Sequence, residues 1–352
     1  MAGRASAVIA ITAGDPCGIG PEVILKALAR PGGHGGRAGA GRRAGRARLV
    51  VIGDLPVFEQ TARRLRLRLP AWRVVAGTTT LPVAPLVFLD CASAQRFVPG
   101  RASRAAGAAS LAYLERAVRL WRAGRLAGLV TGPVTKWAAA KARPGFIGHT
   151  EFLAQAMGCR DIVMAFVSDR LRVALMTRHV PLGAVPRLIT PALVRNTAVT
   201  TARALRQRFR ISNPRLAVCG INPHAGEAGR FGREDERVIR PAVAALRRRG
   251  IRCDGPFAAD GLFACLLLRS RRQAEAARYD AIICAYHDQG LIPFKMTARD
   301  TGCQVTLGLP VVRTSPDHGS ALDIAGKGIA HPGSMRYALC LAESLAAAGG
   351  GC

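Results

Sequence analysis

The sequence has few aromatic residues and no long apolar run, although 49% of its 352 residues are hydrophobic. A membrane-spanning helix needs about 20 consecutive apolar residues, and no run of that length occurs. The short apolar run near the N-terminus leads directly into a glycine-rich motif, which is not the arrangement of a signal peptide. We therefore expect a globular, cytoplasmic protein that is long enough for two domains.

Cysteine pairs with metal-binding spacing are also absent. The ten cysteines include no CxxC pair and follow no regular spacing, and most of them lie in apolar segments. Neither a disulfide framework nor a zinc–thiolate site is indicated. We interpret the cysteines as buried free thiols.

Acidic residues are scarce, and the net charge is +29. A charge of this size is typical of nucleic-acid-binding proteins. However, 46 of the 51 basic residues are arginines spread along the chain, and aromatic residues make up only 5%. No RNA-recognition motif, zinc finger or aromatic-interleaved basic strip is present. Nucleic-acid binding is therefore the less favoured alternative, and we expect the charge to attract anionic, phosphorylated substrates.

Two common catalytic signatures are missing. The sequence contains neither the GxxxxGK[ST] motif of P-loop NTPases nor the GxSxG motif of α/β-hydrolases. The glycine-rich motif ITAGDPCGIGPE follows an apolar run and precedes a helical pattern, but it does not match the dinucleotide-binding pattern GxGxxG.

Short apolar strands alternate with amphipathic helical segments, which predicts an α/β fold with helices on both faces of the sheet. A low-complexity Gly/Arg/Ala segment, residues 31–48, interrupts the pattern, and we interpret it as a flexible surface insertion. Strands are expected at residues 8–13, 49–53, 74–76, 86–89, 129–131, 162–167, 172–176, 216–221, 281–285 and 304–307, and helices at 107–123, 191–208, 234–249 and 334–347.

Three histidines follow three different predicted strands at nearly the same offset. His179 and His224 each come three residues after a strand, and His287 comes two residues after one. Ligands of open α/β sheets bind beyond the carboxyl ends of the strands. Three imidazoles at that edge are able to hold one divalent metal and leave positions open for a substrate. Glu227 and Asp288 are either outer-shell partners of these imidazoles or solvated loop charges.

Two further clusters are typical of anion sites. His149 and Thr150 precede a predicted helix, and Thr150 is a candidate N-cap. Arg313 follows a predicted strand and is itself followed by the hydroxyl residues Thr314 and Ser315. An arginine among hydroxyl groups at a strand end suits bidentate phosphate binding, with a solvated arginine as the alternative.

Five motifs occur in the order found in one family: GDPCGIGPE, GHTEFLA, NPHAGEAG, HDQGLIPFK and TLGLPVVRTSPDHGSALDIAGKG. From Ile9 to about Leu345, the chain resembles the PdxA family of 4-hydroxythreonine-4-phosphate dehydrogenases. The resemblance implies a two-domain α/β fold similar to that of isocitrate and isopropylmalate dehydrogenases, with the active site in the interdomain cleft. Residues 1–145 and 300–352 would form the first domain, and residues 146–299 the second, which would carry the metal histidines and the dimer interface.

The resemblance also implies roles for individual residues. One divalent metal (Zn²⁺, Mg²⁺, Mn²⁺ or Co²⁺) would be shared between the subunits of a homodimer. NAD, with NADP as the alternative, would be the cofactor, and residues 317–333 would form part of its site. The implied residues are His179, His224 and His287 for the metal, His149, Thr150, Lys295, Gln304 and Arg313 for the substrate, Lys295 and Asp260 for catalysis, and Asp317, His318 and Gly319 for the cofactor.

Two positions depart from the family's pattern. Gln304 stands where the family has an asparagine, so the amide lies one methylene further from the backbone. The usual ADT sequence reads ADG here, so Gly261 follows Asp260. Asp260 itself is retained as a candidate for proton transfer near the metal, with a loop carboxylate as the alternative.

The resemblance implies NAD-dependent oxidative decarboxylation of 4-phosphohydroxy-L-threonine to 3-amino-2-oxopropyl phosphate in pyridoxal phosphate synthesis. A paralogue that oxidises 4-phospho-D-threonate or 4-phosphoerythronate would keep every motif and is the nearest alternative. A metal-dependent phosphohydrolase would use the same histidines, but the carboxylate-rich clusters typical of two-metal sites are missing.

Overall fold

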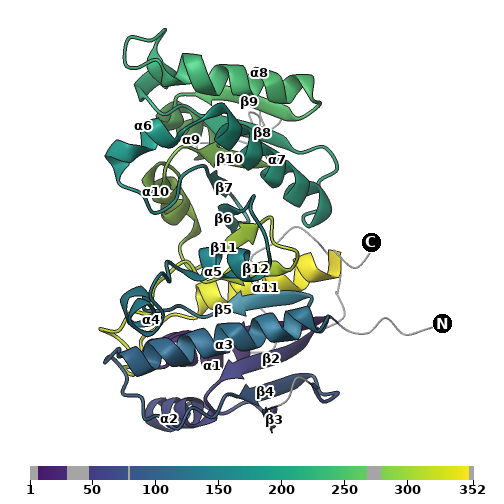
Figure 1. Ribbon diagram of the computed structural model, residues 1–352, viewed down its shortest axis with the longest axis vertical. Helices are drawn as coiled ribbons and strands as arrows, with labels where there is room; N and C mark the ends of the chain where they lie inside the picture. Colours follow the sequence, from purple (N-terminus) through teal and green to yellow (C-terminus); the bar gives the residue numbers. More distant parts are fainter. Residues whose placement is uncertain (1–6, 30–46, 78–79, 268–278, 349–352) are drawn as a thin grey trace, which may run out of the picture. The chain divides into compact units, whose positions relative to one another are not determined.

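The computed structural model describes residues 7–29, 47–77, 80–267 and 279–348. The chain divides into two compact units (Figure 1). Residues 31–46 of the predicted insertion lie outside the described residues. No described helix is long and apolar enough to cross a membrane. The first unit comprises Met1–Arg160, Asp300–Val305 and Leu309–Cys352, and the second unit comprises Asp161–Arg299 and Thr306–Gly308.

The first unit is built on a mostly parallel sheet with the strand order β3-β4-β2-β1-β5-β12-β11. The pairs from β3 to β12 are parallel, whereas β11 and β12 are antiparallel. The carboxyl ends of β1, β5 and β12 therefore lie at one edge. The strands are β1 (Val8–Thr12), β2 (Arg48–Gly53), β3 (Arg73–Ala76), β4 (Leu86–Asp90), β5 (Gly128–Thr131), β11 (Gly302–Leu307) and β12 (Val312–Ser315).

Helices cover both faces of this sheet. The connection from β1 to β2 moves in one direction along the sheet, and the connection from β4 to β5 moves in the other. Because such crossovers are right-handed, α1 (Gly20–Leu28) and α3 (Arg104–Arg122) lie on opposite faces. Helices α2 (Leu55–Leu65) and α11 (Gly333–Ala348) pack against α1. The central strands are buried on both faces, which explains their continuous apolar sequences.

The sheet strands of the second unit are arranged in the order β6-β7-β10-β8-β9. Strands β6 and β7 form an antiparallel hairpin, and β7, β10, β8 and β9 are parallel. Phe166, Leu291 and Phe294 belong to the apolar core beside this sheet. Its elements include β6 (Val163–Ser168), β7 (Arg172–Leu175), β8 (Arg215–Cys219), β9 (Arg252–Phe257), β10 (Ala281–Cys284), α6 (Val185–Leu188), α7 (Pro191–Gln207), α8 (Arg240–Arg248), α9 (Ala259–Leu267) and α10 (His287–Ala298).

The predicted α/β class is confirmed, and all ten predicted strands are present to within two residues at each end. Strands β9 and β12 were not predicted. The β9 sequence RCDGPF contains a glycine and a proline, and β12 contains Arg313, so neither has the apolar character expected of a buried strand. The helix expected at residues 234–249 begins instead as a π-helix, Asp235–Ile239, before α8.

Residues 146–160 belong to the first unit, whereas the sequence assigned them to the second. This segment contains α5 (His149–Ala156), which follows α4 (Lys136–Ala142). Phe146 is buried with Leu111 and Leu114 of α3 and Ala139 of α4. The apolar contact with α3 and α4 therefore determines where the segment belongs.

Helices α3 and α4 approach each other closely at Gly107. A Cβ atom on Gly107 would lie 2.1 Å from the carbonyl oxygen of Ala138, a backbone atom that has no side-chain freedom to move away. The glycine is therefore required for this helix contact. Gly261 in α9 is different, because a Cβ atom there would meet nothing within 4 Å.

We expect Gly107→Ala to lower the free energy of unfolding by at least about 2 kcal/mol, because the added methyl group forces α3 and α4 apart. Gly261→Ala is the matched control, and it should be neutral or stabilising by up to about 1 kcal/mol, since alanine favours the helix. Thermal and urea unfolding of both variants measure the difference. Equal midpoints for the two variants would contradict the packing argument.

Candidate functional site

The three predicted metal histidines lie beyond the carboxyl ends of neighbouring strands in the second unit. Strands β7, β10 and β8 are adjacent and parallel, and His179, His287 and His224 follow them in that order. Parallel strands bring their carboxyl ends to one edge of a sheet, where ligands of α/β proteins bind. The strand arrangement on which the histidine prediction depended is therefore present.

His179 and His287 lie close together. Their ring centroids are 5.8 Å apart. His287 is the first residue of α10, and its Nδ1 atom lies 2.6 Å from Oδ1 of Asp288. A carboxylate at Nδ1 favours the tautomer whose Nε2 lone pair is available to a ligand, which is the arrangement of many metal-binding histidines.

Gln289 holds the ends of β10 and β8 together. Its Oε1 atom accepts a hydrogen bond from the Ala285 amide at 2.7 Å, and its Nε2 atom donates to the Gly220 carbonyl at 2.7 Å. Thr177 adds a bond from its hydroxyl to the Ala285 carbonyl at 2.7 Å. These contacts fix the backbone from which His287 and His179 project. Sequence reasoning missed this role, although Gln289 lies within the quoted HDQG motif.

The loop that carries His224 is held by Asp235. This carboxylate is fully buried and accepts hydrogen bonds from the amides of Ile221 (2.8 Å) and Asn222 (3.1 Å) and from the Asn222 side chain (2.9 Å). Four non-glycine residues of the loop have positive φ angles: His224, Ala225, Glu227 and Ala228. Non-glycine residues in this region store conformational strain, which is commonly found at functional sites.

A single chain does not bring all three histidines together. Among the described residues, no group of three His, Cys, Asp or Glu side chains is arranged to hold a metal. The His224 ring instead lies 6.1 Å from the ring of Phe231. Asp260 is exposed at the start of α9, and Lys295 is exposed on α10, eight residues after His287.

The predicted substrate residues of the first unit form a second group, centred on Arg313. Arg313 lies on β12, is only 2% exposed and donates from Nη2 to the hydroxyl of Thr131 on the neighbouring strand β5 at 2.6 Å. Burial lowers the pKa of Arg313 to about 10. The side chain therefore stays charged at neutral pH, and the solvated alternative for this arginine is wrong.

His149 and Thr150 belong to the same group. Burial, followed by the positive charges of Arg313 and Lys136, lowers the pKa of His149 well below its usual value, so the imidazole is neutral at physiological pH. Thr150 is buried, and its Oγ1 atom lies 3.4 Å from Nε2 of Gln304. The predicted N-cap role of Thr150 is wrong, because Gly148 occupies the N-cap and α5 begins at His149.

The predicted cofactor residues follow β12. The Asp317 amide donates to Oγ of Ser334 at 3.0 Å, and Oδ1 of Asp317 lies 2.7 Å from the same hydroxyl, which fixes Asp317 against the start of α11. His318 has its Nδ1 atom 3.0 Å from the Gly319 carbonyl, and its buried Nε2 atom has no hydrogen-bond partner among the described residues. A ring nitrogen that has no hydrogen-bond partner among the described residues, next to an exposed glycine, is compatible with a ligand that binds at this loop.

The loop after β12 also contacts the loops after β1 and β5. The Ser320 carbonyl accepts from the Ile19 amide at 2.9 Å, and the Ser320 hydroxyl lies 2.8 Å from that of Thr135. The glycine-rich motif near the N-terminus thus forms part of the carboxyl edge of this sheet. A ligand beyond β1, β5 and β12 would meet all three loops.

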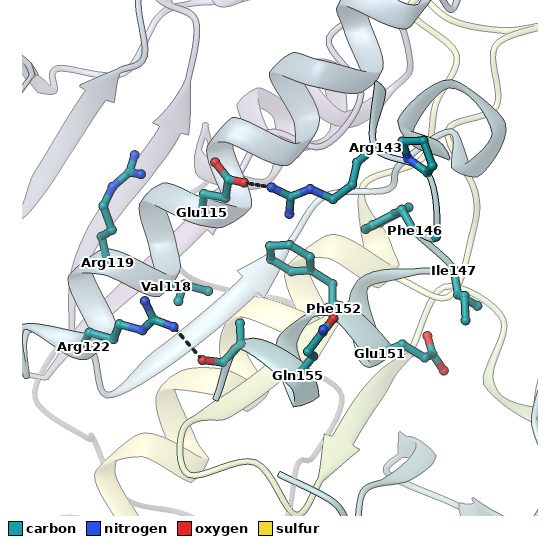
Figure 2. Close-up of a pocket in the computed structure, with 13 residues that line it drawn as sticks. Glu115, Val118, Arg119, Arg122, Arg143, Phe146, Ile147, Glu151, Phe152 and Gln155 are labelled. Atoms are coloured by element: carbon teal, nitrogen blue, oxygen red, sulfur yellow. Dashed lines mark hydrogen bonds and ion pairs between the residues drawn. The ribbon is translucent and has the colours of Figure 1, made fainter. Parts of the chain in front are cut away.

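A cavity of about 700 Å³ in the first unit lies away from these residues (Figure 2). It is lined by α3, α5 and the segment between α4 and α5. Arg143 pairs with Glu115 across it, and Arg122 donates to the Ala156 carbonyl at 3.0 Å. None of the predicted metal, substrate, catalytic or cofactor residues lines the cavity. One residue that lines the cavity, Glu151, is a sequence neighbour of the substrate group, because it directly follows Thr150 in α5.

Comparison with known proteins gives matches over almost the whole chain. The profile of the family described as "Pyridoxal phosphate biosynthetic protein PdxA" matches residues 45–342. The 4-hydroxythreonine-4-phosphate dehydrogenase of Caulobacter vibrioides is 41% identical over 345 residues, covering 96% of this chain and 97% of the relative. That of Methylorubrum populi is 42% identical over 350 residues, covering 96% and 94%.

Solved structures agree with the sequence matches. The crystal structure of 4-hydroxythreonine-4-phosphate dehydrogenase from Klebsiella pneumoniae superposes with a TM-score of 0.78 at 32% identity, covering 97% of this chain and all of that one. A terephthalate 1,2-cis-dihydrodiol dehydrogenase from Burkholderia xenovorans superposes with a TM-score of 0.61 at 30% identity, covering 97% and 98%.

We expect the stability contributed by His149 to depend on pH. Because its folded-state pKa is lowered, the unfolded chain binds more protons below about pH 6.5, and folding stability is lost as the pH falls. The difference in unfolding free energy between the wild type and His149→Gln should therefore shrink by up to roughly 1.4 kcal/mol per pH unit below 6.5. Urea unfolding of both proteins between pH 7.5 and pH 5 measures this. A difference that does not change with pH would show that folding does not lower the pKa of His149.

Proposed function

Because this chain belongs to the pyridoxal phosphate biosynthetic protein PdxA family, we propose that it catalyses the NAD-dependent oxidative decarboxylation of 4-phosphohydroxy-L-threonine to 3-amino-2-oxopropyl phosphate. The observation that carries the proposal is the match, at about 40% identity and over nearly full length, to curated relatives named 4-hydroxythreonine-4-phosphate dehydrogenase. The side-chain groups of the two units provide the chemical support.

The substrate's anionic groups are assigned to positively charged and hydrogen-bonding residues. Arg313 presents a buried guanidinium group beside the neutral imidazole of His149 and the hydroxyl of Thr150. A guanidinium group binds phosphate or carboxylate oxygens in a bidentate manner. Gln304 and Lys295 complete the proposed substrate contacts. Binding of these non-reacting groups orients the hydroxyl-bearing carbon for oxidation.

The metal is assigned to His179, His287 and His224. The support is the ring pair formed by His179 and His287 and the carboxylate at Nδ1 of His287. Three neutral imidazoles suit Zn²⁺ or Co²⁺, while Mg²⁺ and Mn²⁺ prefer oxygen ligands and would draw some of them from the substrate and water. When bound, a divalent ion supplies Lewis acidity that favours the substrate alkoxide and the enolate formed on loss of CO₂.

The third ligand is proposed to come from a second copy of the chain. His179 and His287 lie together, whereas His224 is not grouped with them among the described residues of one chain. A homodimer in which each His224 completes the partner's site would bring three imidazoles to each metal.

The remaining roles follow from the side-chain chemistry. Asp260 is assigned the role of general base, in which its carboxylate accepts the proton of the substrate hydroxyl. Lys295 neutralises negative charge on the substrate through its ammonium group. Asp317, His318 and Gly319 are assigned to the dinucleotide, and the nicotinamide ring supplies the hydride acceptor when bound. NAD is proposed over NADP on the basis of the family.

We expect the purified protein to form NADH from NAD and 4-phosphohydroxy-L-threonine, and EDTA to abolish this activity because the metal favours the alkoxide. Absorbance of NADH measures turnover, and adding back each divalent ion identifies the metal. 4-Phospho-D-threonate and 4-phosphoerythronate are the comparison substrates. Turnover of one of these alone would overturn the substrate assignment, and no turnover of any substrate with metal supplied would overturn hydride transfer.

The shared metal site predicts complementation between inactive variants. His224→Ala and His287→Ala should each lose at least about 100-fold in activity, since each removes one metal ligand. Mixing the two after subunit exchange should restore about a quarter of wild-type activity, because half of the dimers are then mixed and each holds one intact site. The control is a mixture of His179→Ala with His287→Ala, which should stay inactive. Recovery in the control but not in the test mixture would contradict the assignment of His224 to the partner.

A further inference from the structure

Helix α1 carries an ion pair beside the loop that connects β12 to α11. Glu22 is the last residue of the glycine-rich motif ITAGDPCGIGPE, and its Oε1 atom lies 2.7 Å from Nζ of Lys26. The two residues are one helical turn apart, and their side chains are 2% and 19% exposed. Folding thus removes most of the hydration of both charges, and a pair of this kind needs further hydrogen bonds to offset that loss.

The further hydrogen bonds come from the backbone of residues 326–330, which we call the clamped segment. Nζ of Lys26 donates to the carbonyls of Gly328 and Ala330, both at 2.8 Å. Oε1 of Glu22 accepts a hydrogen bond from the Ala330 amide at 3.0 Å. The ion pair therefore satisfies both backbone groups of Ala330, as a neighbouring strand does in a sheet.

The ammonium group of Lys26 has no proton left for a ligand. It carries three protons, and the acceptors of these protons are Glu22 and the carbonyls of Gly328 and Ala330. Any contribution of Lys26 to ligand binding is therefore indirect, through the backbone that it holds.

Helix α2 holds the other end of the clamped segment. Nε of Arg64 donates to the Gly326 carbonyl at 2.9 Å. Gly326 and Gly328 have φ angles of +73° and +76°. Glycine adopts these left-handed conformations without steric cost, but it is also the residue with the greatest backbone freedom when nothing holds it. The conformation of the segment therefore depends on the side chains that bind its carbonyls.

The clamped segment lies within the loop that carries the predicted cofactor residues. It follows Asp317, His318 and Gly319 and precedes α11, whose Ser334 is hydrogen-bonded to Asp317. A loop that is ordered before binding loses little conformational entropy when its ligand binds, so its affinity is higher than that of a mobile loop.

We propose that Glu22 and Lys26 are positioning residues that preorganise the loop between β12 and α11 for a dinucleotide. The inference rests on the proposed function in taking the ligand of this loop to be NAD. Because the pair carries no net charge, its contribution comes from ordering the loop and not from attraction of the phosphate groups. The role also accounts for Glu22 in a glycine-rich motif that does not match GxGxxG.

The test variant is Glu22→Gln/Lys26→Met. Removal of Lys26 alone would leave a buried carboxylate without its cation, which is strongly destabilising. The double variant keeps an acceptor for the Ala330 amide and the same net charge, and it loses the donors to the carbonyls of Gly328 and Ala330. We expect it to bind NAD roughly tenfold more weakly, the result if the loop holds its binding conformation about a tenth of the time.

A second variant acts on the same segment from the surface. Arg64 is exposed, so Arg64→Met leaves the core of the first unit intact. It should weaken NAD binding roughly threefold, because it frees only the Gly326 carbonyl. Lys26→Arg keeps a cation with several donors and should bind NAD within about threefold of the wild type.

Arg48→Met is the matched control. Arg48 donates from Nε to the Ala84 carbonyl at 3.3 Å and from Nη2 to the Pro82 carbonyl, so it also holds two loop carbonyls with one cation. That loop precedes β4 and lies at the opposite edge of the sheet from the loops after β1, β5 and β12. NAD binding by Arg48→Met should stay within about twofold of the wild type.

Kinetics separate positioning from a general loss of structure. The double variant should raise KM for NAD roughly tenfold, while kcat and KM for the phosphorylated substrate change less than about twofold. A variant that is only less stable has a smaller active fraction, so its apparent kcat falls and its KM for NAD does not change. Calorimetric titration measures NAD binding, thermal unfolding shows that each variant is folded, and hydrogen exchange of the amides of residues 321–333 measures the order of the loop.

Three outcomes decide the proposal. Equal NAD binding by the double variant and the wild type would overturn it, and so would an equal loss of NAD binding in Arg48→Met. Weaker NAD binding with faster exchange in the loop, confined to the Glu22, Lys26 and Arg64 variants, supports it. If the wild type makes no NADH from any of the three substrates but these binding differences persist, the proposed reaction falls while the positioning role stands.

Discussion

The burial of one positive charge organises the first unit. Arg313 lies on a central strand with 2% of its surface exposed, where a guanidinium group loses most of its hydration. The residues around Arg313 are neutral or polar side chains, which a buried positive charge requires because it has lost its hydration. Thr131 accepts its hydrogen bond, His149 is kept neutral, and Gln304 and Thr150 add oriented polar groups. A buried cation of this kind is stabilised further by an anion, and this supports the proposal that the unit binds a phosphorylated acid.

In the second unit, the backbone must hold three imidazoles just beyond the ends of strands. His179, His224 and His287 all follow strand ends, where no ladder of hydrogen bonds fixes the chain. Side-chain hydrogen bonds fix the backbone there instead. Gln289 links the ends of β10 and β8, and the buried carboxylate of Asp235 holds the loop that carries His224. The same loop tolerates four non-glycine residues with positive φ because these bonds hold it.

The sequence predicted more of the fold than of the side-chain networks. Alternating apolar and helical segments located ten strands correctly, because those strands are buried on both faces and so read as continuous apolar runs. The two strands that were missed carry glycine, proline or a buried arginine, whose local preferences oppose a strand. Residues 146–160 were predicted to belong to the second unit, but they belong to the first. Their place depends on the contact of Phe146 with α3 and α4, which is a tertiary contact.

For the candidate site, the sequence by itself determined which residue types stand at the strand ends, since motif order and spacing are properties of the chain. It also determined that His179, His224 and His287 follow strands that can lie side by side. Only the tertiary structure decided that His179 and His287 meet while His224 does not join them, that Arg313 is buried, and that Ser315 lies opposite Gln304. The physical reason is that burial and hydrogen-bond partnership depend on strand order and register, which bring together residues as far apart in the chain as Arg313 and Thr131.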